Sequence, residues 1–502
     1  MIDRLLTGLT LWLLWIIRRV ISLDRRAYML LSAGALQPLL TKIGMLRAHA
    51  VYLKAKDHCP AYRAFLETEA YRRRGPILGG SAWKLSDLPI TTKENYVKKY
   101  AIVERCYYGR LPATGVVIDE SSGSSGVPNN WVRSAEERED VKRILQLNYQ
   151  LIYRDSGCIL LNCFALGPWA TGMNVSMSLV DVGILKSIGP DQKKLENTLD
   201  TFGRDYRYLL FGYPPFIKSF VDTTPLDLEQ YQMDLIVGGE GISEPLRAHL
   251  LQYFHTVISS YGASDLEINI GVETDLTISL RRLCMKDHEL SQELFGREMP
   301  PMIFQYNALD YIIETTPEGE LVFTIGRQTS AAPKIRYNLH DLGGTMTHQQ
   351  LTEILASKSI DVLDLARPQS RFPLLFVFGR SDLTVPFYGA KVYPTDIEEI
   401  INGDPNLVKQ INSFQIASYE DESIDRRLKI RLETVKHLPS GPLAPVEQLH
   451  QTLFEGLCRV NQDFREVTKM FDRSCVEIEI YEFENGPFSD RDIRVKNKYV
   501  TQ

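Results

Sequence analysis

The sequence lacks the cysteine and charge patterns that assign many proteins to a class at once. Its seven cysteines are scattered, odd in number and without a Cys-x-x-Cys pair. This argues against a disulfide framework and is typical of unpaired thiols in a reducing compartment such as the cytoplasm. The formal net charge is −6, so the chain has no overall positive field of the kind that a nucleic-acid-binding protein uses. We therefore expect no nucleic-acid partner.

The apolar run at the N-terminus is too short for an ordinary membrane span. Residues 5–17 form 13 positions without a charge and include Trp12 and Trp15, whereas crossing a bilayer takes about 20 apolar residues. Arginines follow the run, in place of the small-residue cleavage site of a signal peptide. Residues 1–24 therefore predict an apolar and basic helix, for which two locations are open. It lies in the plane of an anionic lipid surface as a peripheral membrane contact, or it docks on its own domain.

The length of 502 residues is too great for one core and predicts two or three domains. Apolar runs of strand length alternate with helical stretches between about residues 134 and 260, which is typical of β-α-β units in largely parallel sheets. Residues 277–295 predict one amphipathic helix. The sequence thus predicts an α/β fold with a large N-terminal domain of stacked βαβ-type sheets and helices over 25–378. A small α+β C-terminal domain is expected over 379–502.

A loop of small hydroxyl residues and glycine, at 119–128, is the strongest pointer to a ligand. Its glycines let the backbone turn so that successive N–H groups converge on an anion, and its serines add short donors. The loop lacks the lysine spacing of a Walker motif, and such a cluster alone is also typical of a flexible linker. The polyphosphate cradle that it predicts consists of Ser121, Ser122, Gly123, Ser124, Ser125 and Gly126.

Four further segments end a strand-like apolar run in small or polar residues, at 235–240, 257–265, 334–341 and 379–382. Any one of them is a common turn. In this order after the serine–glycine loop, they resemble the adenylate-forming (AMP-binding) superfamily, and most closely its phenylacetate–CoA ligase-like branch. Residues 88–96 resemble an early segment of that branch, and residues 319–324 resemble the strand before its ribose motif.

The resemblance implies a binding site for ATP and Mg²⁺. The serine–glycine loop is similar to the loop that holds the β- and γ-phosphates. Asp265 stands where the family usually has a glutamate that helps to hold Mg²⁺, a cation that prefers carboxylate oxygens. The remaining nucleotide contacts that it implies are an adenine turn at Gly238, Gly239 and Glu240, an opposite wall at Tyr261 and Gly262, and a ribose site at Asp341 and Arg380.

The resemblance also implies a small domain that is mobile. Asp382 matches the hinge about which it rotates between adenylation and thioester formation, and Gly389 matches a glycine that lines the thiol channel after rotation. The acyl pocket is expected between the phosphate loop and the adenine turn. Phe164, Trp169 and Tyr213 are its candidate walls, and Met173, Phe211 and Pro214 are further candidates. Aromatic side chains there suit an aromatic or other apolar acid, although such residues are usually part of a core.

The C-terminal tail departs from the family pattern. Most relatives carry a Gly-Lys pair whose lysine contacts the carboxylate and the α-phosphate during adenylation, and the best register places Arg491 and Asp492 there. Arg491 would supply charge without a titratable amine, and Lys496 would serve if the tail slipped by one turn. We expect one of these two to be the catalytic cation. The alternatives are that they are solvated tail charges, that adenylation is slow, or that the enzyme acts chiefly on activated acyl groups.

The function that the resemblance implies is that of an AMP-forming acid–thiol ligase. It would activate an aromatic or other apolar carboxylate with ATP to an acyl-adenylate and transfer the acyl group to coenzyme A. An alternative acceptor is a carrier-protein thiol, an amine or an alcohol. A second alternative is a catalytically degenerate nucleotide-binding scaffold, which Asp492 favours and the retained Asp265, Asp341 and Arg380 oppose.

The tail hypothesis predicts that the double substitution Arg491→Ala with Lys496→Ala slows adenylation. The expected loss is on the order of 100-fold or more, because a preorganised cation stabilises charge that develops in the transition state. ATP–pyrophosphate exchange measures it. Exchange at the wild-type rate would reject both residues as the catalytic cation.

Overall fold

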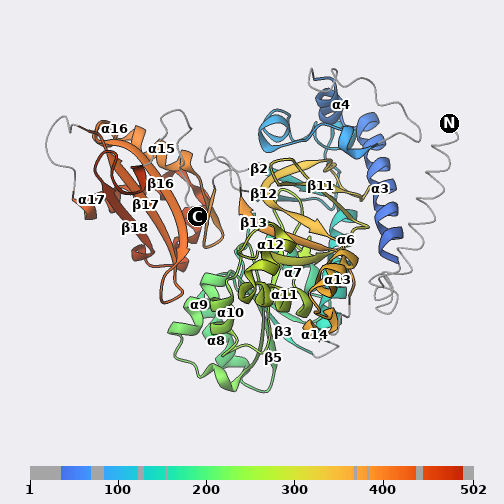
Figure 1. The fold of residues 1–502 in the computed structure, drawn as a ribbon, viewed down its shortest axis with the longest axis horizontal. Coiled ribbons are helices and arrows are strands. Elements are labelled where there is room, and N and C mark those ends of the chain that lie inside the picture. Colours follow the sequence, from blue (N-terminus) through green and yellow to red (C-terminus); the bar gives the residue numbers. More distant parts are fainter. Residues whose placement is uncertain are drawn as a thin grey trace.

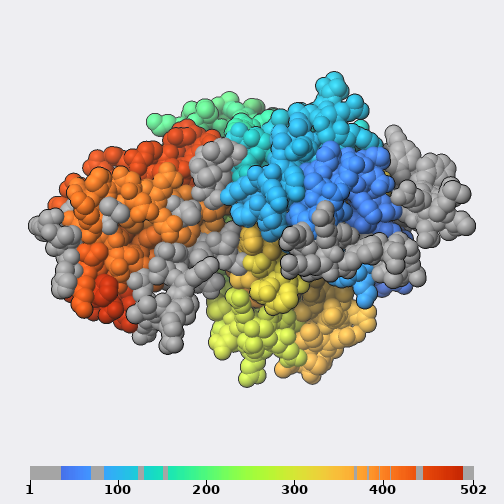
Figure 2. Space-filling view, turned by 90° about the horizontal axis from the view of Figure 1, so that it is seen from above, coloured from blue at the N-terminus to red at the C-terminus, as the bar shows by residue number. Residues whose placement is uncertain are grey.

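The computed structural model describes residues 36–68, 84–121, 129–153, 157–366, 370–380, 384–436 and 445–489. These residues form two lobes that lie side by side (Figures 1 and 2). The large lobe extends to residue 380, and the small lobe begins at residue 384. Residues 1–24, with their predicted helix, lie outside the described residues. Among the described helices, none combines the length and the apolar character that a membrane crossing requires.

The large lobe is built on an 11-stranded mixed sheet. Its parallel half consists, in spatial order, of β7 (Val257–Tyr261), β6 (Gln232–Gly238), β5 (Arg207–Gly212), β3 (Ile159–Asn162) and β4 (Ile184–Ser187). β3 is buried along its whole length, as a strand covered on both faces must be. The predicted α/β class and its parallel β-α-β units are confirmed.

The other half of the sheet is antiparallel, which the sequence did not predict. It continues from β7 through β8 (Gly271–Val272), β9 (Met302–Tyr306), β13 (Leu374–Arg380), β12 (Tyr337–Met346), β11 (Glu320–Ile325) and β10 (Tyr311–Thr315). Because β12 pairs with β13, Asp341 lies directly opposite Arg380 in the register. Asp341 was expected at a strand end, and it lies inside β12 instead, next to a shift of register between Leu342 and Gly343.

A separate two-stranded ribbon precedes the sheet. Its strands are β1 (Val117–Ser121) and β2 (Asn129–Arg133), which pair antiparallel and flank the serine–glycine loop. The loop itself, with Ser122 to Gly126, lies outside the described residues, and so do Asp382, Arg491 and Lys496. Ser121 is the only described member of the predicted phosphate cradle.

Helices cover the sheet. The parallel half is packed against α6 (Ala135–Tyr153), α7 (Ala170–Leu179), α8 (Gln192–Phe202), α9 (Pro214–Thr223) and α10 (Glu244–Leu250), while α3 (Gln37–His58) and α4 (Pro60–Leu66) pack with the antiparallel half. A third apolar cluster joins α11 (Asp275–Lys286), α12 (His288–Phe295), α13 (His348–Ser357) and α14 (Val362–Leu365).

The single helix predicted at 277–295 is wrong, because α11 and α12 are separate helices. The break is at Asp287, whose side chain accepts a hydrogen bond from the backbone N–H of Leu290 at 2.9 Å. This contact caps the start of α12 and offers the backbone an alternative to a continuous helix.

The small lobe has its own three-stranded sheet of β16 (Ile411–Glu420), β17 (Arg426–Thr434) and β18 (Val476–Tyr481). Its helices are α15 (Pro394–Gly403), α16 (Leu407–Gln410), α17 (Val446–Val460) and α18 (Gln462–Val467), and a hairpin of β14 (Val385–Phe387) and β15 (Ala390–Val392) projects from it. Asn461 ties this hairpin to the helices, because its side-chain amide donates to the carbonyl of Lys391 at 2.8 Å and to Asp396 at 2.7 Å.

Asp396 is a buried acid in this lobe, and burial raises its pKa to about 6 in spite of hydrogen bonds from Tyr393 and Asn461. A carboxyl that is protonated more readily when folded contributes stability that is complete below its unfolded pKa, near 3.8, and is lost as the pH rises through 6. We expect this contribution to reach about 3 kcal/mol. Asp396→Asn should therefore flatten the fall in stability between pH 4 and pH 7.

Urea-unfolding midpoints of the wild type and the variant across this pH range measure the effect. Glu422→Gln, in an exposed turn of the same lobe, is the matched control. An identical pH dependence in the wild type and Asp396→Asn would contradict the assignment.

Candidate active site between the two lobes

A cavity of about 620 Å³ lies between the lobes. It gathers all the described site residues of the sequence analysis except Asp265. These are Ser121, Phe164, Trp169, Tyr213, Gly238, Gly239, Glu240, Tyr261, Gly262, Asp341, Arg380 and Gly389. Of the further pocket candidates, Phe211 lines the cavity, while Met173 and Pro214 are not part of its lining.

The wall at the end of β6 is a glycine turn that touches the small lobe. Gly239 has a φ of 83°, and a Cβ there would lie 2.7 Å from the ring of Tyr213. Gly389 of the β14–β15 hairpin has a φ of 87°, and its Cβ would lie 2.6 Å from the same ring. Two glycines from different lobes are therefore needed for Tyr213 to fit between them.

The carboxylate of Glu240 binds the same hairpin. It is buried and accepts a hydrogen bond from the backbone N–H of Gly389, while Arg426 of β17 lies 3.8 Å from its other oxygen. Burial raises the pKa of Glu240, and the charge of Arg426 opposes this shift. Glu240 was expected beneath adenine; the contacts that its carboxylate makes in this structure are with the small lobe.

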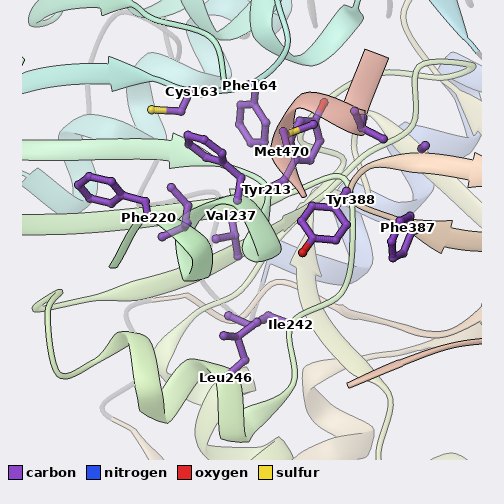
Figure 3. Packing of buried hydrophobic residues seen from close by; sticks show 14 of the residues in the cluster. Cys163, Phe164, Tyr213, Phe220, Val237, Ile242, Leu246, Phe387, Tyr388 and Met470 are labelled. Carbon is purple, nitrogen blue, oxygen red and sulfur yellow. The ribbon is translucent and has the colours of Figure 1, made fainter. Parts of the chain in front are cut away.

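Tyr213 belongs to an apolar cluster that continues from one lobe to the other. Its ring lies edge-on to Phe164, with the centroids 5.1 Å apart. Figure 3 shows Tyr213 and Phe164 facing Tyr388 and Met470 of the small lobe. Tyr213 thus lines the cavity, as a wall residue would, and also packs in the interface of the lobes.

Two further polar pairs between the lobes support this arrangement. Lys218 of α9 lies 2.7 Å from Asp425 of the small lobe, and Ser243 donates to Glu420 of β16. The small lobe is therefore held by contacts with three successive parts of the parallel half, at α9, the β6 turn and the start of α10.

The predicted ribose site consists of a carboxylate with two partners. Arg380 Nη1 lies 3.3 Å from one oxygen of Asp341, and the hydroxyl of Tyr261 donates to the other. Burial and the charge of Asp341 raise the pKa of Tyr261 well above its ordinary value. Tyr261 therefore keeps its proton, and its hydroxyl fixes the orientation of the carboxylate that lines the cavity.

Asp265, the predicted Mg²⁺ ligand, lies beside this cavity and not in its lining. Its Oδ2 accepts a hydrogen bond from Tyr337 at 3.0 Å and lies 3.7 Å from Lys93 Nζ. Although burial works in the opposite direction, the charges of Lys93 and Lys391 hold the pKa of Asp265 well below its usual range. Asp265 is therefore a carboxylate at neutral pH.

The donor set fits a magnesium ion only in part. The Oδ1 atom of Asp265 is buried and accepts no hydrogen bond from a described residue, so it is available as one ligand. In the part of the chain that the structure describes, no three acidic, histidine or cysteine side chains cluster as a metal site. Mg²⁺ commonly binds through one or two carboxylates and takes its other ligands from substrate phosphates and water.

The sequence analysis missed a group of cations near Asp265. Lys334 lies 3.9 Å and Arg105 5.6 Å from the centre of the Trp131 ring, whose indole N–H donates to Ser121 at 2.9 Å. Burial and the nearby arginines lower the pKa of Lys334 well below its ordinary value. Lys93 lies inside the segment at 88–96 that carries part of the resemblance, and Lys391 lies two residues after Gly389, so their closeness to these matches is the signal that could have found them.

The lining from α6 and α7 is mostly apolar. It includes Leu145 of α6 and Val175 and Leu179 of α7, next to Phe164 and Trp169. Such a surface excludes water and favours an apolar ligand group. Of the predicted acyl walls, Phe164 borders the glycine turn at Gly238, and Trp169 lines the same cavity.

The contact of the two glycines with Tyr213 predicts that Gly389→Ala disrupts the docking of the lobes. The left-handed backbone alone costs a non-glycine residue on the order of 1–3 kcal/mol, and the added Cβ would overlap the Tyr213 ring. Small-angle X-ray scattering should show a more extended molecule. Gly403→Ala, where a Cβ has nothing within 4 Å, should leave the scattering unchanged, and an unchanged curve for Gly389→Ala would contradict the prediction.

Neither a protein-family model nor a curated protein matches this sequence. Solved structures of 2-hydroxyisobutyryl-CoA ligase, however, are similar to it. The structure in the thioesterification state, with 2-HIB-AMP and CoA, has a TM-score of 0.65 and 14% identity over 93% of this chain and 90% of that chain.

Two further structures of the same ligase differ in their state. The postadenylation state with R3-HIB-AMP gives a TM-score of 0.52 at 13% identity, over 93% of this chain and 90% of that chain. An open conformation with 2-HIB-AMP and CoA gives 0.51 at 13% identity, over 93% and 91%. The chain thus has a fold of the kind that its resemblance to the adenylate-forming superfamily predicted, and it shares that fold, over most of its length, with a coenzyme A ligase.

Proposed function

We propose that this protein is an AMP-forming ligase that activates an aromatic or other apolar carboxylate with ATP and transfers the acyl group to coenzyme A. The observation that carries the proposal is the single cavity between the lobes. It joins the glycine turn after β6, the paired Asp341 and Arg380, an apolar wall and Gly389 of the small lobe. In the proposal, the turn and the Asp341–Arg380 pair bind the nucleotide, the apolar wall binds the acyl group, and Gly389 lines the path of the thiol.

In the proposed nucleotide site, adenine lies between the turn at Gly238 and Gly239 and the wall at Tyr261 and Gly262. Glycine permits the close approach of a flat ring to the backbone. Asp341 accepts hydrogen bonds from the ribose hydroxyls, and Arg380, which pairs with it, orients this carboxylate. The serine–glycine loop from Ser121 to Gly126 holds the β- and γ-phosphates.

The cations next to Ser121 favour this placement of the polyphosphate. Lys93 and Arg105 bring positive charge to the side of the site where the loop begins, and Lys334 lies beside Arg105 on the Trp131 ring. Positive groups that are fixed before the substrate binds stabilise the negative charge of a departing pyrophosphate without reorganisation. Asp265 would hold a Mg²⁺ ion there, and that ion would supply further charge neutralisation to the phosphates.

The proposed reaction has two steps. A carboxylate oxygen of the acid attacks the α-phosphorus of ATP, the bond to the pyrophosphate breaks, and an acyl-adenylate forms. A thiol sulfur then attacks the acyl carbon, and AMP leaves with the electron pair of the broken carbon–oxygen bond. Phe164 and Trp169 would exclude water from the acyl group between the two steps.

We further propose that the lobes are domains that rotate between these steps. The large domain would comprise 25–378 and the small domain 379–502, with the hinge at Asp382 and the adenylation cation at Arg491 or Lys496. The higher TM-score with the thioesterification state than with the postadenylation state supports the view that the docked arrangement is the thiol-transfer arrangement. In it, Gly389 lines the cavity as a channel glycine would.

ATP–pyrophosphate exchange with a panel of aromatic and aliphatic acids tests the first step. Exchange that depends on an apolar acid is the expected result, followed by release of AMP in an amount equal to the acid when coenzyme A is added. If exchange occurs but coenzyme A releases no AMP, coenzyme A is not the acceptor. The acceptor would then be a carrier-protein thiol, an amine or an alcohol. If no acid supports exchange, the ligase proposal is rejected, and the alternative of a catalytically degenerate nucleotide-binding scaffold is favoured.

Asp341→Asn tests the ribose contact. We expect the KM for ATP to rise on the order of 10- to 100-fold, because a charged acceptor for two hydroxyls is lost. Glu318→Gln, an exposed acid in the turn before β11, is the matched control and should leave KM unchanged. A wild-type KM in Asp341→Asn would remove Asp341 from the site.

A further inference from the structure

Lys391 is a half-buried lysine that the small lobe places in the cavity. It lies in the middle of β15, between Ala390 and Val392, which are 1% and 0% exposed in the apolar cluster. Side chains alternate between the faces of a strand, so Lys391 points away from that cluster, and it lines the cavity. Its position depends on the docking of the adjacent Gly389 on Glu240.

The backbone of Lys391 is fixed on both sides. Its carbonyl accepts the 2.8 Å hydrogen bond from Asn461, and its partner across the hairpin is Pro386. The chain thus holds the strand rigidly while the ammonium group makes no hydrogen bond or ion pair with a described residue. Burial and the nearby charge of Arg380 lower the pKa of Lys391 below its ordinary value.

The acids near Lys391 already have partners. Asp341 pairs with Arg380 and accepts from Tyr261, and Asp265 pairs with Lys93. Their charges favour the protonated form of Lys391 without a contact shorter than 4 Å. A half-buried ammonium that has lost part of its hydration and has no contacting counter-ion favours the binding of an anion next to it.

The surrounding cavity indicates which anion this is. Lys391 lies near the Asp341–Arg380 pair of the proposed ribose site and opens into the same cavity as the apolar acyl wall. The group that connects a ribose to an acyl chain in an acyl-adenylate is the 5′-phosphate. This placement rests on the proposed function.

We infer that Lys391 binds the 5′-phosphate of the nucleotide and stabilises AMP as the leaving group of the thiol-transfer step. In that step, the carbon–sulfur bond forms, the bond between the acyl carbon and the phosphate oxygen breaks, and its electron pair remains on AMP. The thiol proton passes to solvent. The ammonium group of Lys391 neutralises the charge that develops on the departing phosphate oxygen.

The inference assigns separate cations to the two steps. The C-terminal tail carries an aspartate at the usual lysine position, whereas Lys391 enters the cavity with the hairpin that docks in the observed arrangement. Lys391 therefore acts when the small lobe is docked. Substitution of Lys391 should slow the second step more than the first.

Isothermal titration calorimetry with AMP and adenosine tests the phosphate contact independently of the acid and the acceptor. Lys391→Met should weaken AMP binding on the order of 10- to 100-fold, the usual effect of losing a charged hydrogen bond, and leave adenosine binding unchanged. Lys391→Arg should retain most of the preference for AMP. Lys409→Met, at an exposed lysine of α16, is the matched control and should behave as the wild type.

The outcomes separate this inference from the proposed function. Wild-type protein that binds neither AMP nor adenosine would reject the proposed function and this inference with it. AMP binding that Lys391→Met leaves unchanged would overturn the inference alone. An equal loss of AMP and adenosine binding would also overturn it, because the variant would then disturb the site as a whole and not the phosphate contact.

A single-turnover assay tests the role in the second step. Enzyme loaded with its acyl-adenylate is mixed with coenzyme A, and the release of AMP is followed. Lys391→Met should slow this release on the order of 100-fold while pyrophosphate exchange changes much less, and Lys391→Arg should restore part of the rate. An equal effect on exchange and release would overturn the assignment to the second step.

Discussion

The docking of the β14–β15 hairpin on the turn after β6 is the contact on which the site depends. Glu240 accepts a hydrogen bond from the backbone of Gly389, and Tyr213 packs against the two glycines at 239 and 389. Without this contact, the cavity would have no wall from the small lobe, and Lys391 would face solvent. The interaction is specific because it needs two positive-φ glycines and one aromatic ring, which come from three separate parts of the chain.

The charges of the site follow from its burial. Asp265 and Glu240 are buried and Lys391 is half-buried, and their pKa values move differently because their partners differ. Lys93 and Lys391 together lower the pKa of Asp265, whereas Glu240 has one arginine at 3.8 Å and its pKa is raised. The basic side chains of Lys93, Lys391 and Arg105 surround the carboxylate of Asp265. A site built this way is preorganised for a polyanion, which agrees with the proposed placement of the phosphates.

The sequence predicted the parallel half of the sheet because strand-length apolar runs alternate there with helical stretches, as in β-α-β units. It could not predict the antiparallel half, since pairing between β12 and β13 is decided by contacts far apart in the chain. The position of Asp341 inside β12 has the same cause. The break between α11 and α12 was missed because the apolar pattern continues across it. The side chain of Asp287 caps the start of α12 there and ends the preceding helix. Lys391 was missed because its role depends on how the two lobes meet, and the local sequence carries no signal for that.

The docking contact also limits how the small lobe can leave. If it rotates away, Glu240 loses the N–H of Gly389 and the charge of Arg426 in one step, because both belong to the small lobe. A buried carboxylate without a donor is costly, so undocking requires a replacement partner, entry of water or uptake of a proton. The raised pKa of Glu240 reduces the cost of the last route.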